Sequence, residues 1–557
     1  MRHIKEVEDI AQNALFDSAT LDSCSWWVTD LTDSARRELD ENWQGIFRRS
    51  LLRLMPATQL GGHFHASFGR PTKELHSMAA LVFIMEFKNW TLDDAVDAYT
   101  FNNGIHFALH LPNRHNYLCT RTLEEYRRLV REDEAAGEVF LQVTRTLVAA
   151  LGISVARQRL DSTHLLSDMA SFGRTKLLAV AVKRLLTALK RHCPESYAAL
   201  PAELRERYET TLGRLFGEAS TSKERRASAQ LQVAQDMHQL IETFADDANI
   251  HGRSTYKDLA RLFAEHCEIQ DQQIAVRPKS IDSEGQSGHT LQNPSDPDAG
   301  YSGHKGAGYQ VQLSETSAAE NPVQLIVACL PQSAGDQDSA AVVPILAQLQ
   351  GQQMQPVELA ADTAYGSDEN HQHAAQAGID LISPVPGRPP TEQNPELQEQ
   401  AAEPSRSPAS KKRRGRPATE QSKAAQQKVQ RNAQRREREQ SEEWREKYRR
   451  RAGVESVNRG LDRLTGIKQL RVRGKRAVTH SVYGKVMGWN IVQSARAIRK
   501  AAIQARKQAE KAITAYLRSM KRAYRALTQV VLCSIHRTIR ATANIHSLPA
   551  KGQAHLA

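Results

Sequence analysis

Residues 358–366 read ELAADTAYG and decide the fold, because the residues before Asp362 form a short apolar run that ends at this aspartate. The run has the composition of a buried strand, so the sequence predicts that Asp362 lies at a strand end. A second strand-like run, residues 153–160, ends in the same way at Asp161, within the hexapeptide RLDSTH. Two acids carried by two strands predict a carboxylate site at one edge of a sheet.

A third acid, Glu455, closes the stretch YRRRAGVE at residues 448–455, which we expect to be helical and basic. Three neighbouring carboxylates repel one another unless divalent metal ions lie between them. Two Mg²⁺ ions, or Mn²⁺ in their place, can clamp a phosphate between an attacking and a leaving oxygen. The sequence therefore predicts metal-dependent phosphoryl transfer on nucleic acid, with Asp161, Asp362 and Glu455 as catalytic residues and metal ligands. Asp168 and Asp298 are the alternative candidates for the two aspartates, and Glu443 and Glu446 are the alternatives to Glu455.

The order of elements around these acids predicts an α/β fold. Strands are expected near residues 309–313, 323–330 and 379–382, and helices near 340–349 and 368–376. A long stretch of helical periodicity, from about Lys176 to Cys267, interrupts the sheet.

Positive charge is concentrated at the C-terminal end of the chain. From Lys411 onward there are 37 Lys and Arg against 9 Asp and Glu, a net charge of +28, whereas the preceding part carries −16. Such asymmetry indicates a region that binds a polyanion, with DNA as the leading candidate, although a solvated tail would share the composition. Arg414 and Arg416, in RGRP, resemble the arginine pair of an AT-hook that enters a narrow minor groove.

Other bulk properties exclude several classes of protein. No apolar run is long enough to span a membrane, and the N-terminal residues lack the apolar stretch of a secretory signal. The six cysteines are scattered without any Cys-x-x-Cys pair, which favours reduced thiols over a zinc site or a disulfide framework. We therefore expect a cytoplasmic protein with no membrane partner.

Three blocks of sequence resemble the signature of bacterial insertion-sequence DDE transposases. They are DSTH at Asp161, DTAY at Asp362, and the Tyr-x2-Arg-x3-Glu pattern formed by Tyr448, Arg451 and Glu455. The family pattern continues with a basic residue seven positions later, where this chain has Asp462 followed by Arg463. The order of strands, helices and insertions likewise resembles an RNase H-like core.

The resemblance implies a domain organisation and a helical module that binds DNA. It implies a helical N-terminal segment at 1–64, a helical transposase N-terminal domain at 65–140, and an RNase H-like catalytic core at 150–500. Within the core, 165–300 is a mainly helical insertion and 387–440 a basic flexible one; basic helices occupy 488–557. In the N-terminal domain, Arg127 and Arg128 are expected on the outer face of a helix, as in a DNA-docked helix-turn-helix, although an ordinary charged solvent face would look alike.

The resemblance also implies an activity and its partners. The expected reaction is hydrolysis of a phosphodiester at each terminal inverted repeat, followed by strand transfer into target DNA, by a homodimer or higher oligomer at the bacterial nucleoid. Tyr448, Arg451, His164 and Lys305 are candidate DNA contacts. A metal-dependent nuclease on the same fold, or a non-catalytic repressor derived from a transposase, remain the alternatives.

Overall fold

The computed structural model describes residues 30–65, 73–111, 116–170, 172–209, 223–277, 287–387 and 420–545. The chain forms two compact units, Met1–Ser494 and Ala495–Ala557. The expected AT-hook arginines, Arg414 and Arg416, lie outside the described residues.

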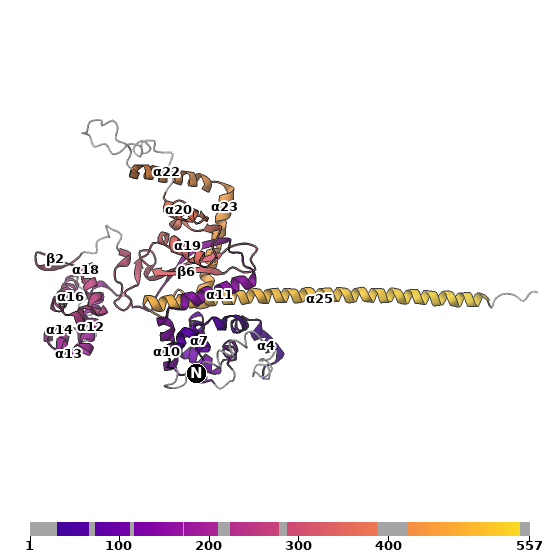
Figure 1. The fold of residues 1–557 in the computed structure, drawn as a ribbon, viewed down its shortest axis with the longest axis horizontal. Coiled ribbons are helices and arrows are strands. Elements are labelled where there is room, and N and C mark those ends of the chain that lie inside the picture. Colours follow the sequence, from indigo (N-terminus) through magenta and orange to yellow (C-terminus); the bar gives the residue numbers. More distant parts are fainter. Residues whose placement is uncertain are drawn as a thin grey trace, which may run out of the picture. The chain divides into compact units, whose positions relative to one another are not determined.

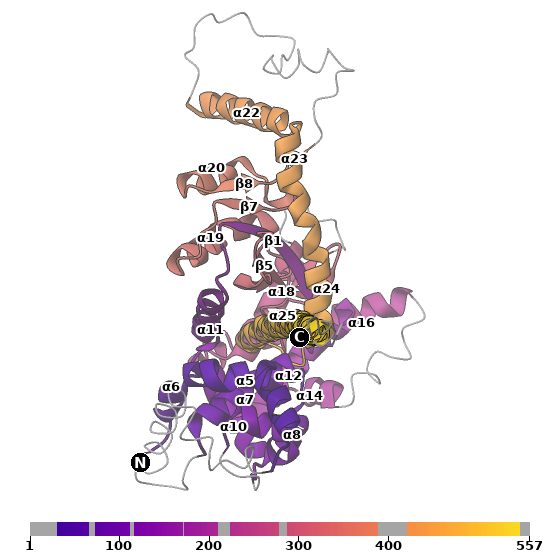
Figure 2. The same ribbon diagram turned by 90° about the vertical axis from the view of Figure 1, so that its right-hand side faces the viewer.

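The N-terminal part of the first unit is helical, as expected, and is built around α7 (Figure 2). Helix α7 is apolar around its whole circumference, so it is stable only when neighbours cover every side. All of its residues except His76 are buried. The helices are α4 (Asp33–Asp40), α5 (Trp43–Ile46), η2 (Phe47–Leu51), η3 (Leu52–Leu54), α6 (Ala57–Gly61), α7 (Leu75–Phe87), α8 (Leu92–Phe101), α9 (Asn103–Ala108), α10 (Thr120–Glu132) and α11 (Ala136–Leu151).

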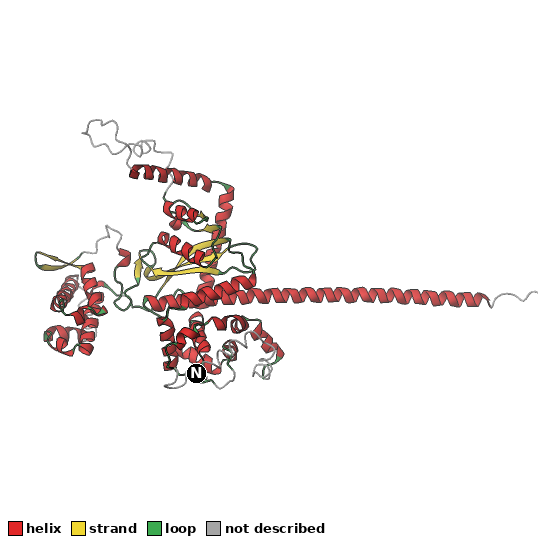
Figure 3. Cartoon of the chain, in the orientation of Figure 1, coloured by secondary structure: helices red, strands yellow, loops and turns green. Residues whose placement is uncertain are grey.

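A mixed sheet follows, in the strand order β6-β5-β1-β7-β8, with β4 also pairing with β5. Strand β5 is antiparallel to β1, β4 and β6, whereas β1, β7 and β8 are parallel (yellow in Figure 3). This order confirms the expected α/β fold and agrees with an RNase H-like core. The strands are β1 (Arg157–Leu165), β4 (Gly300–Ser302), β5 (Gly306–Thr316), β6 (Ile326–Ser333), β7 (Glu358–Ala360) and β8 (Asp380–Ile382), with η6 (Asp338–Ala341), α19 (Val342–Gly351), η7 (Thr363–Tyr365) and α20 (Asp368–Gln376) between them.

A helical bundle lies between β1 and β4 along the chain, where a helical insertion was expected (Figure 1). It has a hydrophobic core of its own, in which Leu185 and Leu189 are packed with Leu240 and Leu259. Its elements are α12 (Arg174–His192), α13 (Pro194–Ala198), α14 (Ala202–Glu209), α16 (Lys223–Thr243), α17 (Ala248–His251), α18 (Ser254–His266), β2 (Cys267–Gln270), β3 (Gln273–Val276) and η5 (Ser287–His289).

The basic insertion expected to be flexible over 387–440 contains an ordered helix, α22 (Glu420–Glu439). Its arginines explain the difference, because Arg431 and Arg435 both pair with the buried carboxylate of Asp368 at 2.5–2.6 Å. Arg438 pairs in the same way with Asp380. Ion pairs to the sheet domain thus order a segment that has no apolar periodicity of its own.

Three short helical elements lead from α22 to the end of the core: α23 (Glu442–Arg449), η8 (Arg450–Gly453) and α24 (Val454–Thr465) (Figure 2). Helix α25 (Lys475–Ile545) then begins thirteen residues before the expected start at Gly488 and continues as one helix through the described C-terminal residues. Most of its residues from Val478 to Ser494 are buried, and Gly488 lies directly against Phe87 of α7, where a Cβ would be only 2.1 Å from that side chain. No helix of the described residues is long and apolar enough to cross a membrane.

Candidate active site

The register of two parallel strands brings Asp161 and Asp362 together. Arg159 of β1 is paired with Ala360 of β7, so the aspartates two residues further on are neighbours. The expectation that Asp161 ends its strand is wrong in detail, because β5 pairs with β1 as far as Leu165. Asp161 lies instead where the pairing with the shorter strand β7 ends.

Asp362 is fixed by the turn that follows β7. It caps η7 by accepting a hydrogen bond from the backbone N–H of Ala364 through Oδ1, at 2.9 Å. Ser383 donates a further hydrogen bond to its backbone carbonyl. These contacts leave Oδ2 of Asp362 for other partners, and about a third of the side chain is exposed.

The two carboxylates are incompletely neutralised. Burial, together with the charge of Asp362, raises the pKa of Asp161 to about 6, although Arg451 and Lys305 act in the opposite direction. The guanidinium Nη2 of Arg451 is 3.4 Å from Asp362 Oδ2 and 3.9 Å from Asp161 Oδ1. A single cation, at distances longer than a good ion pair, thus bridges both acids.

Arg159 holds the segment that carries Arg451. It pairs with buried Glu315 of β5 and donates through Nη1 to the backbone carbonyl of Arg450, at 3.2 Å. Gly453 allows this approach, because a Cβ at that position would be 1.9 Å from Nη1 of Arg159. This hydrogen bond from Arg159 holds the turn η8 against β1, directly beside the aspartates.

Glu455 lies in the first turn of α24 and is exposed. Among the described residues, no hydrogen bond or ion pair involves its carboxylate. One turn further along the same face, Asn458 donates to Asp161 Oδ2 at 3.1 Å. Glu455 thus lies next to the site, but in the described part of the chain its carboxylate does not contact the residues of the site.

The spacing of Tyr448, Arg451 and Glu455 predicted that they share one continuous α-helix, but they do not. The 3₁₀ turn η8 separates Tyr448 on α23 from Glu455 on α24. Tyr448 is stacked on Trp444, with ring centroids 4.9 Å apart, and packs against the end of the sheet. Arg451, within η8, reaches both aspartates.

Two other candidate contacts flank the aspartates on β1 and the β4–β5 turn. Lys305 Nζ lies 3.4 Å from the hydroxyl of Ser162 and is exposed. His164 is half-buried beside Gly308, and burial and the charge of Lys305 lower the pKa of its ring. Its imidazole is therefore neutral near pH 7.

The arginines of α10 do not all lie on its outer face. Arg127, together with Arg131, pairs with buried Glu86 of α7 at 3.1 Å, so the expectation for Arg127 is wrong. It lies one turn from the buried residues Leu123 and Val130, which places its guanidinium over the core. Arg128 is exposed and pairs with Glu125 and Glu132.

The donor set fits a hard divalent cation only in part. In the described part of the chain, no three His, Cys, Asp or Glu side chains come close enough to hold a metal ion. Asp161 and Asp362 nevertheless offer oxygen ligands, and the guanidinium of Arg451 stands where positive charge is needed between them. Of the three predicted ligands, Asp161 and Asp362 are the two whose positions here fit a shared Mg²⁺.

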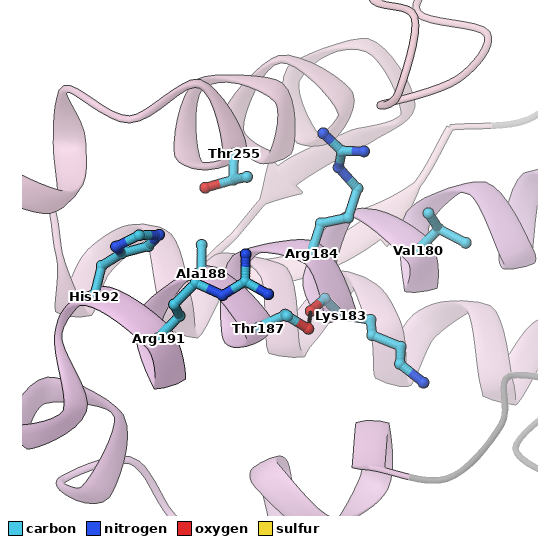
Figure 4. Close-up of a pocket in the computed structure, with 8 residues that line it drawn as sticks. All are labelled: Val180, Lys183, Arg184, Thr187, Ala188, Arg191, His192 and Thr255. Carbon is cyan, nitrogen blue, oxygen red and sulfur yellow. Dashed lines mark hydrogen bonds between the residues drawn. The ribbon is translucent and has the colours of Figure 1, made fainter. Parts of the chain in front are cut away.

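A separate hollow of about 490 Å³ lies in the helical insertion, between α12 and α18 (Figure 4). No acid lines it. The buried atoms Nε of Arg184 and Oγ1 of Thr255 have no hydrogen-bond partner among the described atoms. Its lining is Val180, Lys183, Arg184, Thr187, Ala188, Arg191, His192 and Thr255. Positive charge and unsatisfied polar atoms suit a phosphate-bearing ligand.

Sequence reasoning missed three residues of the candidate site: Arg159, Gly453 and Asn458. Asn458 could have been found, because it lies at i+3 from Glu455 on the same face of a predicted helix. Arg159 and Gly453 act through a contact between segments almost 300 residues apart, which no local pattern indicates.

Comparison with known families matches residues 280–491 to the model described as "Transposase DDE domain". The match includes Asp362, Arg451 and Glu455 but begins after β1, so Asp161 lies outside it. No curated protein and no solved structure matches the chain significantly.

Proposed function

We propose that this chain, whose residues 280–491 are a transposase DDE domain, cuts the ends of an insertion sequence and joins them to target DNA. The observation that carries this proposal is the pair formed by Asp161 on β1 and Asp362 just after the neighbouring parallel strand β7, whose carboxylates share Arg451. Because each hydrolysis or transfer step is an in-line displacement at phosphorus, one site serves both.

Asp161, Asp362 and Glu455 are proposed as the catalytic residues and as the ligands of two Mg²⁺ ions, for which Mn²⁺ can substitute. Bound Mg²⁺ would activate the attacking oxygen and stabilise the leaving oxygen. The strand-borne aspartates supply fixed oxygens, and Glu455 supplies a longer side chain from α24 that can close on the site when DNA binds.

Arg451 has two roles in this proposal. Before DNA binds, its guanidinium offsets the repulsion between Asp161 and Asp362. A scissile phosphate then offers the guanidinium two oxygens in the planar geometry that arginine prefers, which releases the aspartates for metal. Lys305, which lies beside Ser162, can contact the same phosphate backbone.

DNA outside the active site is proposed to contact the hollow of the helical insertion through Lys183, Arg184 and Arg191. The terminal inverted repeats would also contact the N-terminal helices, through exposed Arg128, and the basic C-terminal part, including Arg414 and Arg416. Because two element ends must be cut together, we propose at least a homodimer on DNA, in the bacterial cytoplasm at the nucleoid.

A strand-transfer assay with precut element ends tests the proposal. Joining of a free 3′-hydroxyl to target DNA, dependent on Mg²⁺ or Mn²⁺, is the expected result. Cleavage of intact ends without any joining of precut ends would show a nuclease instead. DNA binding with neither reaction, unchanged in Asp161→Asn, Asp362→Asn and Glu455→Gln, would show a repressor.

A further inference from the structure

The second unit of the chain consists, over Ala495–Ile545, of a single helix whose large apolar side chains are exposed. Lone helices are marginally stable in water, and most helices in proteins depend on packing of an apolar face. Leucine, isoleucine and valine side chains along such a helix therefore indicate a surface that another molecule covers.

Six of the eight large apolar residues between 513 and 531 repeat with alternating spacings of four and three. This is the a/d pattern of a heptad repeat, which places every member on one narrow seam of the helix. The six seam residues are each between 49% and 74% exposed: Ile513, Leu517, Met520, Tyr524, Leu527 and Val531. Glu510 and Arg506 occupy the preceding seam positions, so the apolar seam begins at Ile513.

Between residues 513 and 531 the charges on this helix lie away from the seam. Residues 495–545 contain twelve Lys and Arg and one acid, Glu510, so two copies would repel each other if these charges met. The positions that flank the seam between 513 and 531 are Thr514, Tyr516, Lys521, Ala523, Thr528 and Val530, of which Lys521 alone is charged. Arg518, Arg522 and Arg525 lie on the outer positions of the heptad.

We propose that two copies of this chain associate through the seam Ile513–Val531 as a coiled coil, independently of DNA. The seam is self-complementary, because its apolar residues would meet their equivalents while the nearly uncharged flanks avoid repulsion. The basic outer face remains available for phosphates in the dimer. This inference does not depend on the proposed DNA chemistry.

The molar mass of the full-length protein, freed of nucleic acid and measured by light scattering in high salt, tests the proposal. A dimer at micromolar concentration is expected, since screening of charge leaves apolar association intact. Leu527→Gln should raise the dimer dissociation constant by about tenfold or more, because one buried leucine per copy is lost from the seam.

Leu532→Gln is the matched control, since Leu532 is 54% exposed on the same helix but outside the seam. It should leave the dissociation constant unchanged. Circular dichroism of both variants checks that α25 remains helical at the concentration used.

Three results would overturn the proposal: a monomeric wild-type protein, equal effects of Leu527→Gln and Leu532→Gln, or a dimer that dissociates in high salt. Binding of monomers to duplex DNA or to vesicles of anionic phospholipid, abolished by Leu527→Gln but not by Leu532→Gln, would assign the seam to those ligands instead.

Discussion

Glu86 and Asp161 are two acids of the first unit that each lie near arginine, yet their pKa values are shifted in opposite directions. Glu86 of α7 is buried, and two arginines, Arg127 and Arg131, contact its carboxylate at 3.1 Å. Burial opposes its ionisation, but the charges of His480 and the two arginines prevail and lower its pKa to about 2. At Asp161 burial prevails, and the pKa is raised to about 6.

The difference in pKa indicates that Glu86 has a structural role, whereas Asp161 is suited to bind a positively charged ligand. Glu86 also accepts a hydrogen bond from Ser481 of α25, so its charge is compensated on several sides. Asp161 shares one arginine with Asp362 at 3.4–3.9 Å. An under-compensated pair of carboxylates beside solvent is destabilising by itself, and such strain is typical of functional sites.

The largest expected effect is on DNA cleavage. Asp161→Asn and Asp362→Asn should each reduce the cleavage rate by more than about a hundredfold, because each removes a metal ligand, whereas DNA affinity should be retained. Cleavage of a labelled element end, with binding measured by gel shift, tests this. Asp168→Asn, an exposed neighbour on the same segment, is the control and should cleave normally.

Glu86→Gln should have the largest effect on stability. Removal of its charge leaves Arg127 and Arg131 buried without a counter-charge, which should cost about 3–5 kcal/mol of unfolding free energy. Chemical denaturation of the first unit measures this loss. Glu455→Gln, which alters an exposed side chain, should change stability by less than about 0.5 kcal/mol. Equal losses in the two variants would contradict the assigned roles.

The two acids should also respond to pH in opposite ways. The folded pKa of Glu86 lies below its ordinary value of 4.5, so its stabilising contribution is present above that pH and is lost as the pH falls toward 2. The folded pKa of Asp161 lies above its ordinary value of 3.8, so its favourable contribution is lost as the pH rises through about 6.

Melting temperatures of two variants across the acidic and neutral range test these opposite slopes. The deficit of Glu86→Gln should shrink as the pH falls below about 4.5. Asp161→Asn should gain stability relative to the wild type at neutral pH and lose that advantage near pH 4. A gain that is constant with pH would show that the charge of Asp161 is not the cause.

A smaller effect is expected from Arg451. If its guanidinium stands in for metal, Arg451→Gln should increase Mn²⁺ affinity without DNA by about fivefold, equivalent to about 1 kcal/mol. Calorimetric titration measures the affinity. Arg449→Gln is a suitable control, because Arg449 pairs with Glu442 on the exposed side of α23. Weaker Mn²⁺ binding by Arg451→Gln would contradict the competition.

The smallest effect concerns the cations that line the hollow of the insertion. Lys183→Gln with Arg191→Gln should reduce the slope of log affinity for DNA against log salt by about 2, since two phosphate contacts are lost. Lys190→Gln with Lys257→Gln removes equal charge from exposed positions outside the hollow. The same decrease in both double variants would show only a general electrostatic effect.

The succession of strands and helices along the chain could be predicted, together with an aspartate on one strand and another just after a second, because local composition and spacing indicate them. The α/β alternation and the helix over 368–376 agree with the structure. Asp161 was misjudged only in its position along β1, since strand length depends on the partner strand β5.

Contacts between distant segments could not be predicted. The break at η8 depends on the contact between Arg159 and Arg450, and the order of α22 depends on ion pairs with Asp368. The inward direction of Arg127 required knowledge of buried Glu86 on another helix. The pattern of a single sequence indicates which face of an element is apolar, but not which charged residue pairs with a residue of another element.

Metal-directed cleavage of the polypeptide tests most directly whether the three acids form one site. With Fe²⁺ in place of Mg²⁺, and with ascorbate and peroxide, hydroxyl radicals cut the backbone near the bound metal. In the presence of a precut DNA end, cuts are predicted near Asp161, Asp362 and Glu455 together. Cuts elsewhere, or near the two aspartates but never near Glu455, would contradict the proposed site.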